Sequence, residues 1–257
     1  MPLNTSFKPA ALTACNPRSN QLLATLPEAD LQRWAAQLEA VDLQLGQVLS
    51  ESGSTPLHVY FPITAIVSLL YTTQDGDCSE IAVVGHDGVV GISLFMGGNA
   101  TPSQAVVQSA GRAYRLPARS LKEDIASSPA VLAMMLHYTR LMLAQVAQTA
   151  ACNRYHSIDQ LLCRRLLLGL DRSASADLAM TQELAANLLG VRREGVTAAA
   201  LKLQQAGVIS YSRGRISVLD RQRLEEQTHS VQGRDNGMFA AAGVAARRVL
   251  QGLPCAA

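Results

Sequence analysis

The stretch MTQELAANLLGVRREGVTAAALKLQQAGVISYSRGRISVL, residues 180–219, decides the fold of the C-terminal part of the chain. Thr181 is a favourable N-cap residue for a first helix, and Gly190 suits the left-handed conformation at its end. The apolar residues at helical spacing in this helix are Leu184, Leu188 and Leu189. A second helix is predicted from about Arg192 to Gly207. Its inward-facing residues are Val196, Ala199, Ala200 and Leu203. Two helices joined by a glycine turn are typical of a helix-turn-helix.

A basic hairpin is predicted to follow the second helix. Residues 208–212 alternate like a strand, Arg213-Gly214 indicates a turn, and residues 216–219 return as a second strand. Arg213 and Arg215 flank the turn glycine, where two cations could straddle a phosphate backbone. This pattern predicts a winged helix-turn-helix.

Arg192, Arg193 and Glu194 fall in the first turn of the second helix, the part that meets base edges in such motifs. Two adjacent arginines at a helix N-terminus oppose the helix dipole unless an anion compensates them, and duplex DNA would be such an anion. The alternative is a solvated charged helix face beside a basic turn.

From about Val41 to Leu224 the sequence resembles the Crp/Fnr family of bacterial transcription regulators, most specifically within residues 180–219. The resemblance implies that the second helix enters the major groove with Arg193 and Glu194 reading bases. Arginine bonding guanine and glutamate accepting from cytosine are both sound chemistry. The family's phosphate-contacting positions are matched by Thr181, Arg192, Arg213 and Arg215.

One turn further along the second helix, this family often carries another base-reading arginine. Ala198 occupies that place here, and Thr197 beside it is a further candidate for contact with DNA. The operator is therefore expected to differ from the best-known family consensus. The resemblance also implies RNA polymerase as a partner of the bound protein.

Composition limits the other classes of protein. The chain has 257 residues, 48% of them hydrophobic, a formal net charge of +2 and only 4% aromatic residues, which argues against a base-stacking single-strand binder. Five scattered cysteines without CxxC spacing favour a reducing compartment. We find no signal peptide and no window approaching a membrane span, so a soluble cytoplasmic protein without a membrane partner is expected.

Period-two patterns begin at Val41 and predict a second, N-terminal domain. The predicted strands include 41–45, HVYFP, AIVSLLYTT, SEIAVVG, AVVQSA and RAYRL, with a hairpin turn at Asp75-Gly76. The fold class is therefore α+β, with an antiparallel, jelly-roll-like β-roll; by resemblance it is the family's cyclic-nucleotide-binding-type roll. The predicted divisions are 1–40 leader and helices, 41–127 sensor roll, 128–155 dimerisation helix, 156–228 DNA-binding domain and 229–257 tail.

The expected effector pocket lacks the charges that cyclic AMP needs. A buried cyclic nucleotide requires an arginine for its phosphate and a carboxylate for its ribose, and the segment 90–110 contains no Arg, Asp or Glu. Ile92 falls where the family places Glu, and Ser103 or Gln104 falls where it places Arg. The candidate pocket residues are Gly91, Ile92, Ser93, Ser103, Gln104 and Thr139. We expect an effector other than conventionally bound cyclic AMP. Arg112 and Arg115 leave room for another anion, or are solvated strand cations.

Ser128-Pro129 predicts the start of a long helix. A heptad seam runs along it: Leu132, Leu136, Thr139, Leu143, Val146 and Ala150. A second apolar row comprises Met134, Met135, Leu141 and Met142. Two rows suit one face on the roll and one on a partner chain, and the resemblance implies a homodimer. Thr139 is expected to bond across the interface or to reach the ligand. The pattern breaks near residues 153–156, and a capping box at Ser157 and Gln160 opens the next helix.

Other chemistry finds little support in the sequence. The five histidines are dispersed, lone Cys15 cannot hold an iron–sulfur cluster, and no catalytic constellation appears, so no metal, no certain cofactor and no enzymatic activity are expected. Cys152 and Cys163 are read as buried apolar residues or as a thiol switch. Residues 238–253 suggest an Ala-rich helix that is either an interaction tail or an untethered end.

The sequence thus predicts a homodimeric regulator that binds duplex DNA at a pseudo-palindrome. Two alternatives remain. One is a ligand-sensing module whose main output is a protein contact; the other is an enzyme with a cupin-like metal site in the roll, for which clustered His and Glu should appear on adjacent strands, and they do not.

Overall fold

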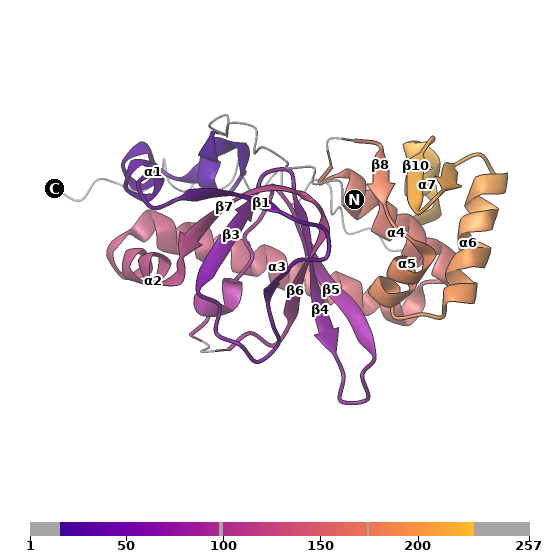
Figure 1. Ribbon diagram of the computed structural model, residues 1–257, viewed down its shortest axis with the longest axis horizontal. Coiled ribbons are helices and arrows are strands. Elements are labelled where there is room, and N and C mark those ends of the chain that lie inside the picture. The colour runs from indigo at the N-terminus through magenta and orange to yellow at the C-terminus, as the bar shows by residue number, and fades with distance from the viewer. Residues whose placement is uncertain (1–15, 98–99, 174, 229–257) are drawn as a thin grey trace, which may run out of the picture.

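The computed structural model describes residues 16–97, 100–173 and 175–228 (Figure 1). Two 3-10 turns, η1 (Pro17–Ser19) and η2 (Leu23–Thr25), and helix α1 (Glu28–Ala35) precede the roll. Asn16 caps η1, and Arg18 forms an ion pair of 2.6 Å with Glu28 of α1. The predictions for residues 1–15 and for the tail lie outside the described residues.

The β-roll predicted from the period-two patterns is confirmed. Its strands are β1 (Glu39–Leu43), β2 (Val48–Ser50), β3 (His58–Pro62), β4 (Ile66–Thr72), β5 (Cys78–Val84), β6 (Gln104–Ser109) and β7 (Gly111–Pro117). They form two antiparallel sheets, β1-β7-β3 and β2-β6-β4-β5. Leu45, expected within the first strand, lies beyond its end and is 59% exposed. Aliphatic side chains from both sheets and Trp34 of α1 share one core.

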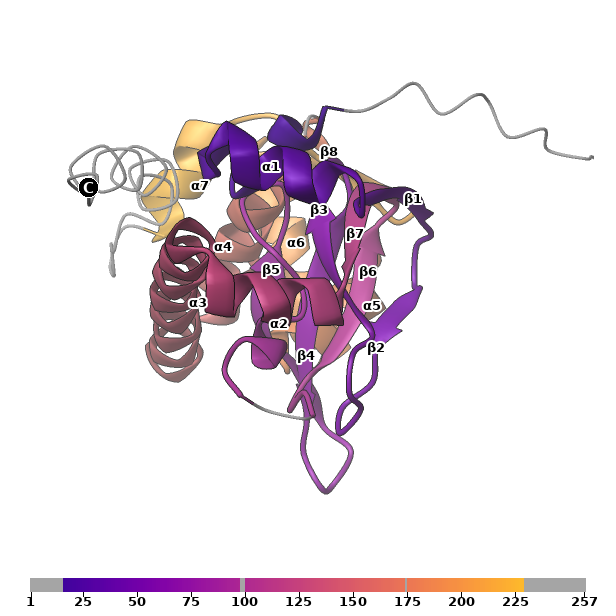
Figure 2. The same cartoon turned by 90° about the vertical axis from the view of Figure 1, so that its left-hand side faces the viewer.

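Helix α2 (Ala118–Ser127) follows the roll and was not predicted from the sequence. Asp124 on this helix accepts a hydrogen bond from Trp34 Nε1 and forms an ion pair with Arg33 at 2.9 Å. These contacts attach α1 to α2 across the end of the roll, as Figure 2 shows. A buried carboxylate with two donors explains why a polar residue is tolerated there.

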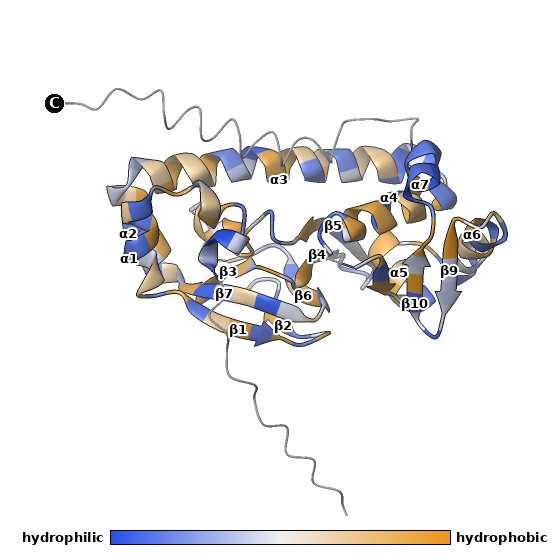
Figure 3. Ribbon diagram, turned by 90° about the horizontal axis from the view of Figure 1, so that it is seen from above, coloured by the Kyte–Doolittle hydropathy of each residue, from blue (hydrophilic) through white to orange (hydrophobic). Residues whose placement is uncertain are grey.

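Helix α3 (Pro129–Tyr155) begins at the predicted Ser128 cap and runs along the roll from α2 to the DNA-binding domain (Figure 3). The two apolar rows face different surroundings. Met134, Met135, Leu141 and Met142 are buried. Leu132, Leu136 and Leu143 of the seam are 37%, 54% and 59% exposed. The helix therefore uses one row for its own core and leaves the three leucines of the other exposed, while Val146 of that row packs against the core of the roll.

By length and composition α3 could cross a membrane, contrary to our expectation that no segment approaches this limit. The two apolar rows together raise its hydropathy. One such helix is weak evidence for a membrane protein, because a core helix passes the same test. The buried row of α3 packs in the core of the roll.

The C-terminal domain is a winged helix-turn-helix, as predicted. It comprises α4 (Ile158–Leu170), β8 (Asp177–Ala179), α5 (Gln182–Leu189), α6 (Arg193–Gln205), β9 (Ile209–Ser212), β10 (Arg215–Val218) and α7 (Arg221–Thr228). The capping box at Ser157 and the Thr181 cap are present, and Gly190 has the left-handed φ of 64°. Strand β8 and helix α7 were not predicted. The buried residues of α5 are Ala185, Ala186 and Leu188, while Leu184 and Leu189 are partly buried.

Candidate nucleic-acid interface and effector pocket

The N-terminus of α6 presents an exposed group of charges. Arg192 is the N-cap residue, without a side-chain capping bond, and Arg193 and Glu194 begin the helix. All three side chains are exposed. Within the described ranges none of them forms an ion pair, so the two guanidinium groups are available to an anion that approaches this end of the helix. Four residues of α6 on the opposite face anchor it in the core: Val196, Ala199, Ala200 and Leu203.

The wing lies against the start of α5. Met180 N donates to Gly214 O at 2.8 Å, and a Cβ at Gly214 would lie 3.2 Å from Thr181 Cγ2. Arg213 takes a positive φ of 49° beside this glycine, and both Arg213 and Arg215 are exposed. The fold thus brings Thr181 to the two wing arginines, which are more than thirty residues away in sequence. The Thr181 hydroxyl accepts from Leu184 N at 3.0 Å, as an N-cap does.

Thr197 connects the two helices of the motif. Its hydroxyl donates to Gln182 Oε1 at 2.8 Å and lies 3.0 Å from Arg193 O. This bond orients the Gln182 carboxamide with its NH₂ group turned away from Thr197. Tyr211 of β9 lies beside Gln182 and Arg193. Burial raises the pKa of Tyr211, whereas the hydrogen bond with the Gln182 backbone and the charge of Arg193 lower it. Gln182 and Tyr211 were not predicted as candidate site residues from the sequence. The one signal in the sequence was that Gln182 is a polar residue directly after the Thr181 cap.

The candidate effector residues come from three parts of the chain: η3 and the glycine before it, the start of β6, and α3. Gly91, with φ 102°, precedes the short 3-10 turn η3 (Ile92–Leu94), in which Ile92 packs against the core. Ser93 Oγ is buried without a hydrogen-bond partner among the described residues. The Thr139 hydroxyl donates to Met135 O at 2.8 Å within the single chain, and its expected bond across an interface or to a ligand stays a prediction.

The position expected to bind a phosphate is unfavourable to one. Gln104 Nε2 donates to Glu51 Oε2 at 2.7 Å, and Ser103 is buried with its backbone N–H directed to Thr101 Oγ1 at 3.5 Å. A carboxylate beside Gln104 would repel an anionic phosphate rather than compensate it. The structure therefore offers polar but uncharged groups at η3 and a negative charge near β6.

No group of three or more potential metal ligands occurs within residues 16–97, 100–173 and 175–228. Cys152 and Cys163 are both buried. Burial raises the pKa of the Cys163 thiol to about 12, and the Asp159 charge adds to this. Such a thiol is a poor nucleophile, which favours the interpretation of Cys163 as an apolar core residue.

Two domain families match the sequence. Residues 40–128 match the cyclic nucleotide-binding domain, and residues 160–227 match the Crp-like helix-turn-helix domain. The chain belongs to the Crp/Fnr family. Members of this family are transcription regulators that combine an effector-binding domain with a DNA-binding one, and the resemblance seen in the sequence is thereby confirmed. A comparison with curated proteins found no match.

Solved structures of this family share the fold. A regulator from Eubacterium rectale assigned to the Crp/Fnr family is 19% identical over 83% of this chain and all of that chain, with a TM-score of 0.65. FixK2 from Bradyrhizobium japonicum is 17% identical over 76% of this chain and 99% of its own, with a TM-score of 0.63. CLP from Xanthomonas campestris, described as a c-di-GMP responsive global regulator, is 16% identical over 75% of this chain and 99% of its own, with a TM-score of 0.60.

Proposed function

We propose that this Crp/Fnr-type regulator acts in the cytoplasm as a homodimer that binds a pseudo-palindromic operator, with α6 in the major groove. The observation that carries the proposal is the exposed N-terminus of α6, where Arg193 and Glu194 stand without an ion-pair partner among the described residues. Arginine reads guanine and glutamate reads cytosine at base edges. The wing arginines and Arg192 would hold the neighbouring phosphates, with RNA polymerase as the partner of the bound protein.

The proposal of a homodimer rests on α3. Leu132, Leu136 and Leu143 form an uncovered apolar row beside the half-buried Thr139 and Val146. An apolar row at heptad spacing is what a parallel helix pair buries between its members. A second copy related by two-fold symmetry would also supply the second reading helix that a pseudo-palindrome needs.

Selection of duplexes from a random pool, followed by mobility shift, tests this function. We expect enrichment of two inverted half-sites about one helical turn apart, roughly 10 bp centre to centre. Binding without sequence preference would mean that the protein contacts phosphates only. If the protein bound no duplex at all, the alternative would be favoured, namely a ligand-sensing module whose main output is a contact with another protein.

We also propose that the effector is not cyclic AMP bound in the usual way. The resemblance aligns Ser103 or Gln104 with the phosphate-binding arginine, and Gln104 is bonded to the Glu51 carboxylate. Calorimetric titration with cyclic AMP tests this proposal. The same titration is made with c-di-GMP, because the related regulator CLP is described as responsive to it. We expect no heat of binding for cyclic AMP. Micromolar binding of cyclic AMP would contradict the proposal, whichever result c-di-GMP gives.

A further inference from the structure

The DNA-binding domain is docked on the sensor roll through both apolar and polar contacts. One apolar cluster at the interface comprises Ile66 of β4, Val83 of β5 and Leu168 of α4. Leu161, Leu188 and Leu189 of the DNA-binding domain line a pocket together with Glu80 and Val83 of β5. Each domain has a much larger core of its own. Two buried ion pairs also cross this interface.

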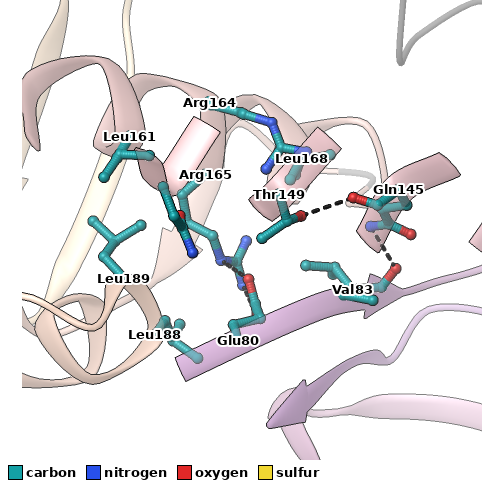
Figure 4. A pocket seen from close by; sticks show the side chains of 12 residues that line it. Glu80, Val83, Gln145, Thr149, Leu161, Arg164, Arg165, Leu168, Leu188 and Leu189 are labelled. Atoms are coloured by element: carbon teal, nitrogen blue, oxygen red, sulfur yellow. Dashed lines mark hydrogen bonds and ion pairs between the residues drawn. The ribbon is translucent and has the colours of Figure 1, made fainter. Parts of the chain in front are cut away.

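The first polar contact is a buried ion pair between Arg165 of α4 and Glu80 of β5. Arg165 Nε lies 2.7 Å from Glu80 Oε1, and Nη2 donates to Oε2 at 3.1 Å, which makes a forked pair (Figure 4). The side chains are 3% and 7% exposed. Ser68 donates to the same carboxylate at 2.5 Å, and Gln108 accepts from Arg165. Burial lowers the pKa of Arg165, and Glu80 opposes that effect.

The second contact joins Arg172, just beyond α4, to Asp87 in the turn after β5. Arg172 Nη2 lies 2.8 Å from Asp87 Oδ2, while Asp87 Oδ1 accepts from Gly85 N at 3.1 Å. The aliphatic part of the Arg172 side chain packs closely against Gly85 in this turn. A Cβ atom at Gly85 would lie only 2.8 Å from Arg172 Cβ. Both arginines belong to the DNA-binding domain and both carboxylates to the sensor, with the same spacing of seven residues in each.

Buried ion pairs make a contact that is specific and yet separable. Their mutual attraction roughly offsets the loss of hydration, so docking gains little net free energy from them. When the domains separate, all four charges regain water. When one partner is missing, the docked state retains an uncompensated buried charge while the separated state does not. The two ion pairs therefore fix the arrangement of the docked domains while adding little to the free energy of docking.

The docked interface touches both functional parts of the protein. Asp87 lies four residues before Gly91, which opens the effector turn η3, and Val90 between them pairs with Tyr60 of β3. At the other end, a Cβ at Gly190, in the turn between α5 and α6, would lie 3.5 Å from Ser79 Cβ. Gly190 lies three positions before Arg193 at the reading end of α6.

We propose that the Arg165–Glu80 and Arg172–Asp87 pairs form a detachable latch whose docking equilibrium regulates DNA binding. A rearrangement at η3 would reach the latch through residues 87–90, and the latch in turn holds α4 and the helix-turn-helix against the roll. The proposal rests on the proposed DNA-binding function, so a duplex selected with the wild-type protein is needed first.

A disulfide can lock the docked state. Cβ atoms 3.5 Å apart lie within the range of natural disulfides, so Ser79→Cys with Gly190→Cys should cross-link under mild oxidation. Cys15, Cys78 and Cys255 are replaced by Ser to prevent other pairings. The left-handed φ of 64° at Gly190 strains a cysteine in the oxidised and reduced forms alike. The reduced protein is therefore the matched control for its own oxidised form.

Glu80→Gln and Asp87→Asn release the latch, because each leaves a buried arginine without its carboxylate. Glu39→Gln is the control: it removes the carboxylate from the 2.7 Å pair of Glu39 with Arg115, which lies within the sensor. In the cysteine background, the release variants should also cross-link more slowly. That second measurement reports undocking without any DNA.

The affinity for the selected duplex decides the proposal. We expect the lock and the release variants to shift the dissociation constant in opposite directions, each by on the order of tenfold, with Glu39→Gln unchanged. A weaker affinity in the locked form identifies docking as the resting state, and a tighter one identifies it as the DNA-competent state. Equal affinities, or shifts of the same sign, would overturn the latch. Failure of the wild-type protein to select any duplex would overturn the proposed function instead, while the cross-linking rates would still test the docking.

Discussion

Arg193 is the residue on which sequence-specific binding is expected to depend most. Its position at the start of α6 places the guanidinium where a base edge would lie. We expect Arg193→Ala to weaken binding to the selected duplex by about 1–3 kcal/mol and to relax preference at one base pair. Competition mobility shifts with single-base variants of the duplex measure both effects.

Arg192→Ala is the matched control for that experiment, because the neighbouring arginine is exposed but is the N-cap rather than a residue of the helix. A phosphate contact should weaken binding to all sequences about equally. If Arg193→Ala also weakened every duplex equally, its role as a base reader would be wrong.

The thiols of the structure should differ sharply in reactivity. At pH 8 the Cys163 thiol, with its pKa raised to about 12, remains protonated, and Cys152 is 1% exposed. We expect iodoacetamide to modify Cys78, which is partly exposed, while Cys152 and Cys163 react only after unfolding. Peptide mass spectrometry after timed labelling checks this. Rapid labelling of Cys163 in the folded protein would instead support the interpretation of this cysteine as part of a thiol switch.

At the scale of elements, α3 combines a core helix with the proposed dimer interface. Leu136 is 54% exposed in the single chain, so Leu136→Lys should leave the fold intact. In a dimer it would place two like charges in an apolar seam, and we expect dissociation to monomers. Sedimentation velocity measures the change.

Leu57→Lys is the control for the dimer experiment, because Leu57 is 77% exposed and lies outside α3. It should leave the mass unchanged. A Leu136→Lys protein that still sediments as a dimer would show that the seam is not the interface.

Elements with strong local signals were predicted well from the sequence. The Thr181 cap, Gly190 and the Ser157 capping box fixed helix ends because their hydrogen bonds are made within one turn. Helix α2 was missed because its buried Asp124 breaks the apolar pattern, and its partners Trp34 and Arg33 are distant in sequence. Strand β8 is three residues long, too short to show a period.

At the scale of the whole molecule, the net charge of +2 is too small to drive binding to DNA, so the local arginines must do so. We expect the affinity to fall steeply with salt, and Arg213→Ala to reduce the slope of log K against log salt by about 1. Filter binding at several salt concentrations measures the slope. Arg119→Ala is the control, since Arg119 is an exposed arginine of α2 in the sensor; an equal loss of slope there would mean that only overall charge matters.

The sequence by itself determined the two domains, the order of most strands, the long helix and the reading helix with its arginines. These features follow from periodicity, caps and turn residues, which act over a few residues. Only the tertiary structure decided how the domains meet. Arg165 and Glu80 are 85 residues apart in the sequence, and so are Arg172 and Asp87, yet the fold buries each pair together. The energy of a buried charge depends on the partner that faces it, and no local pattern in the chain specifies that partner.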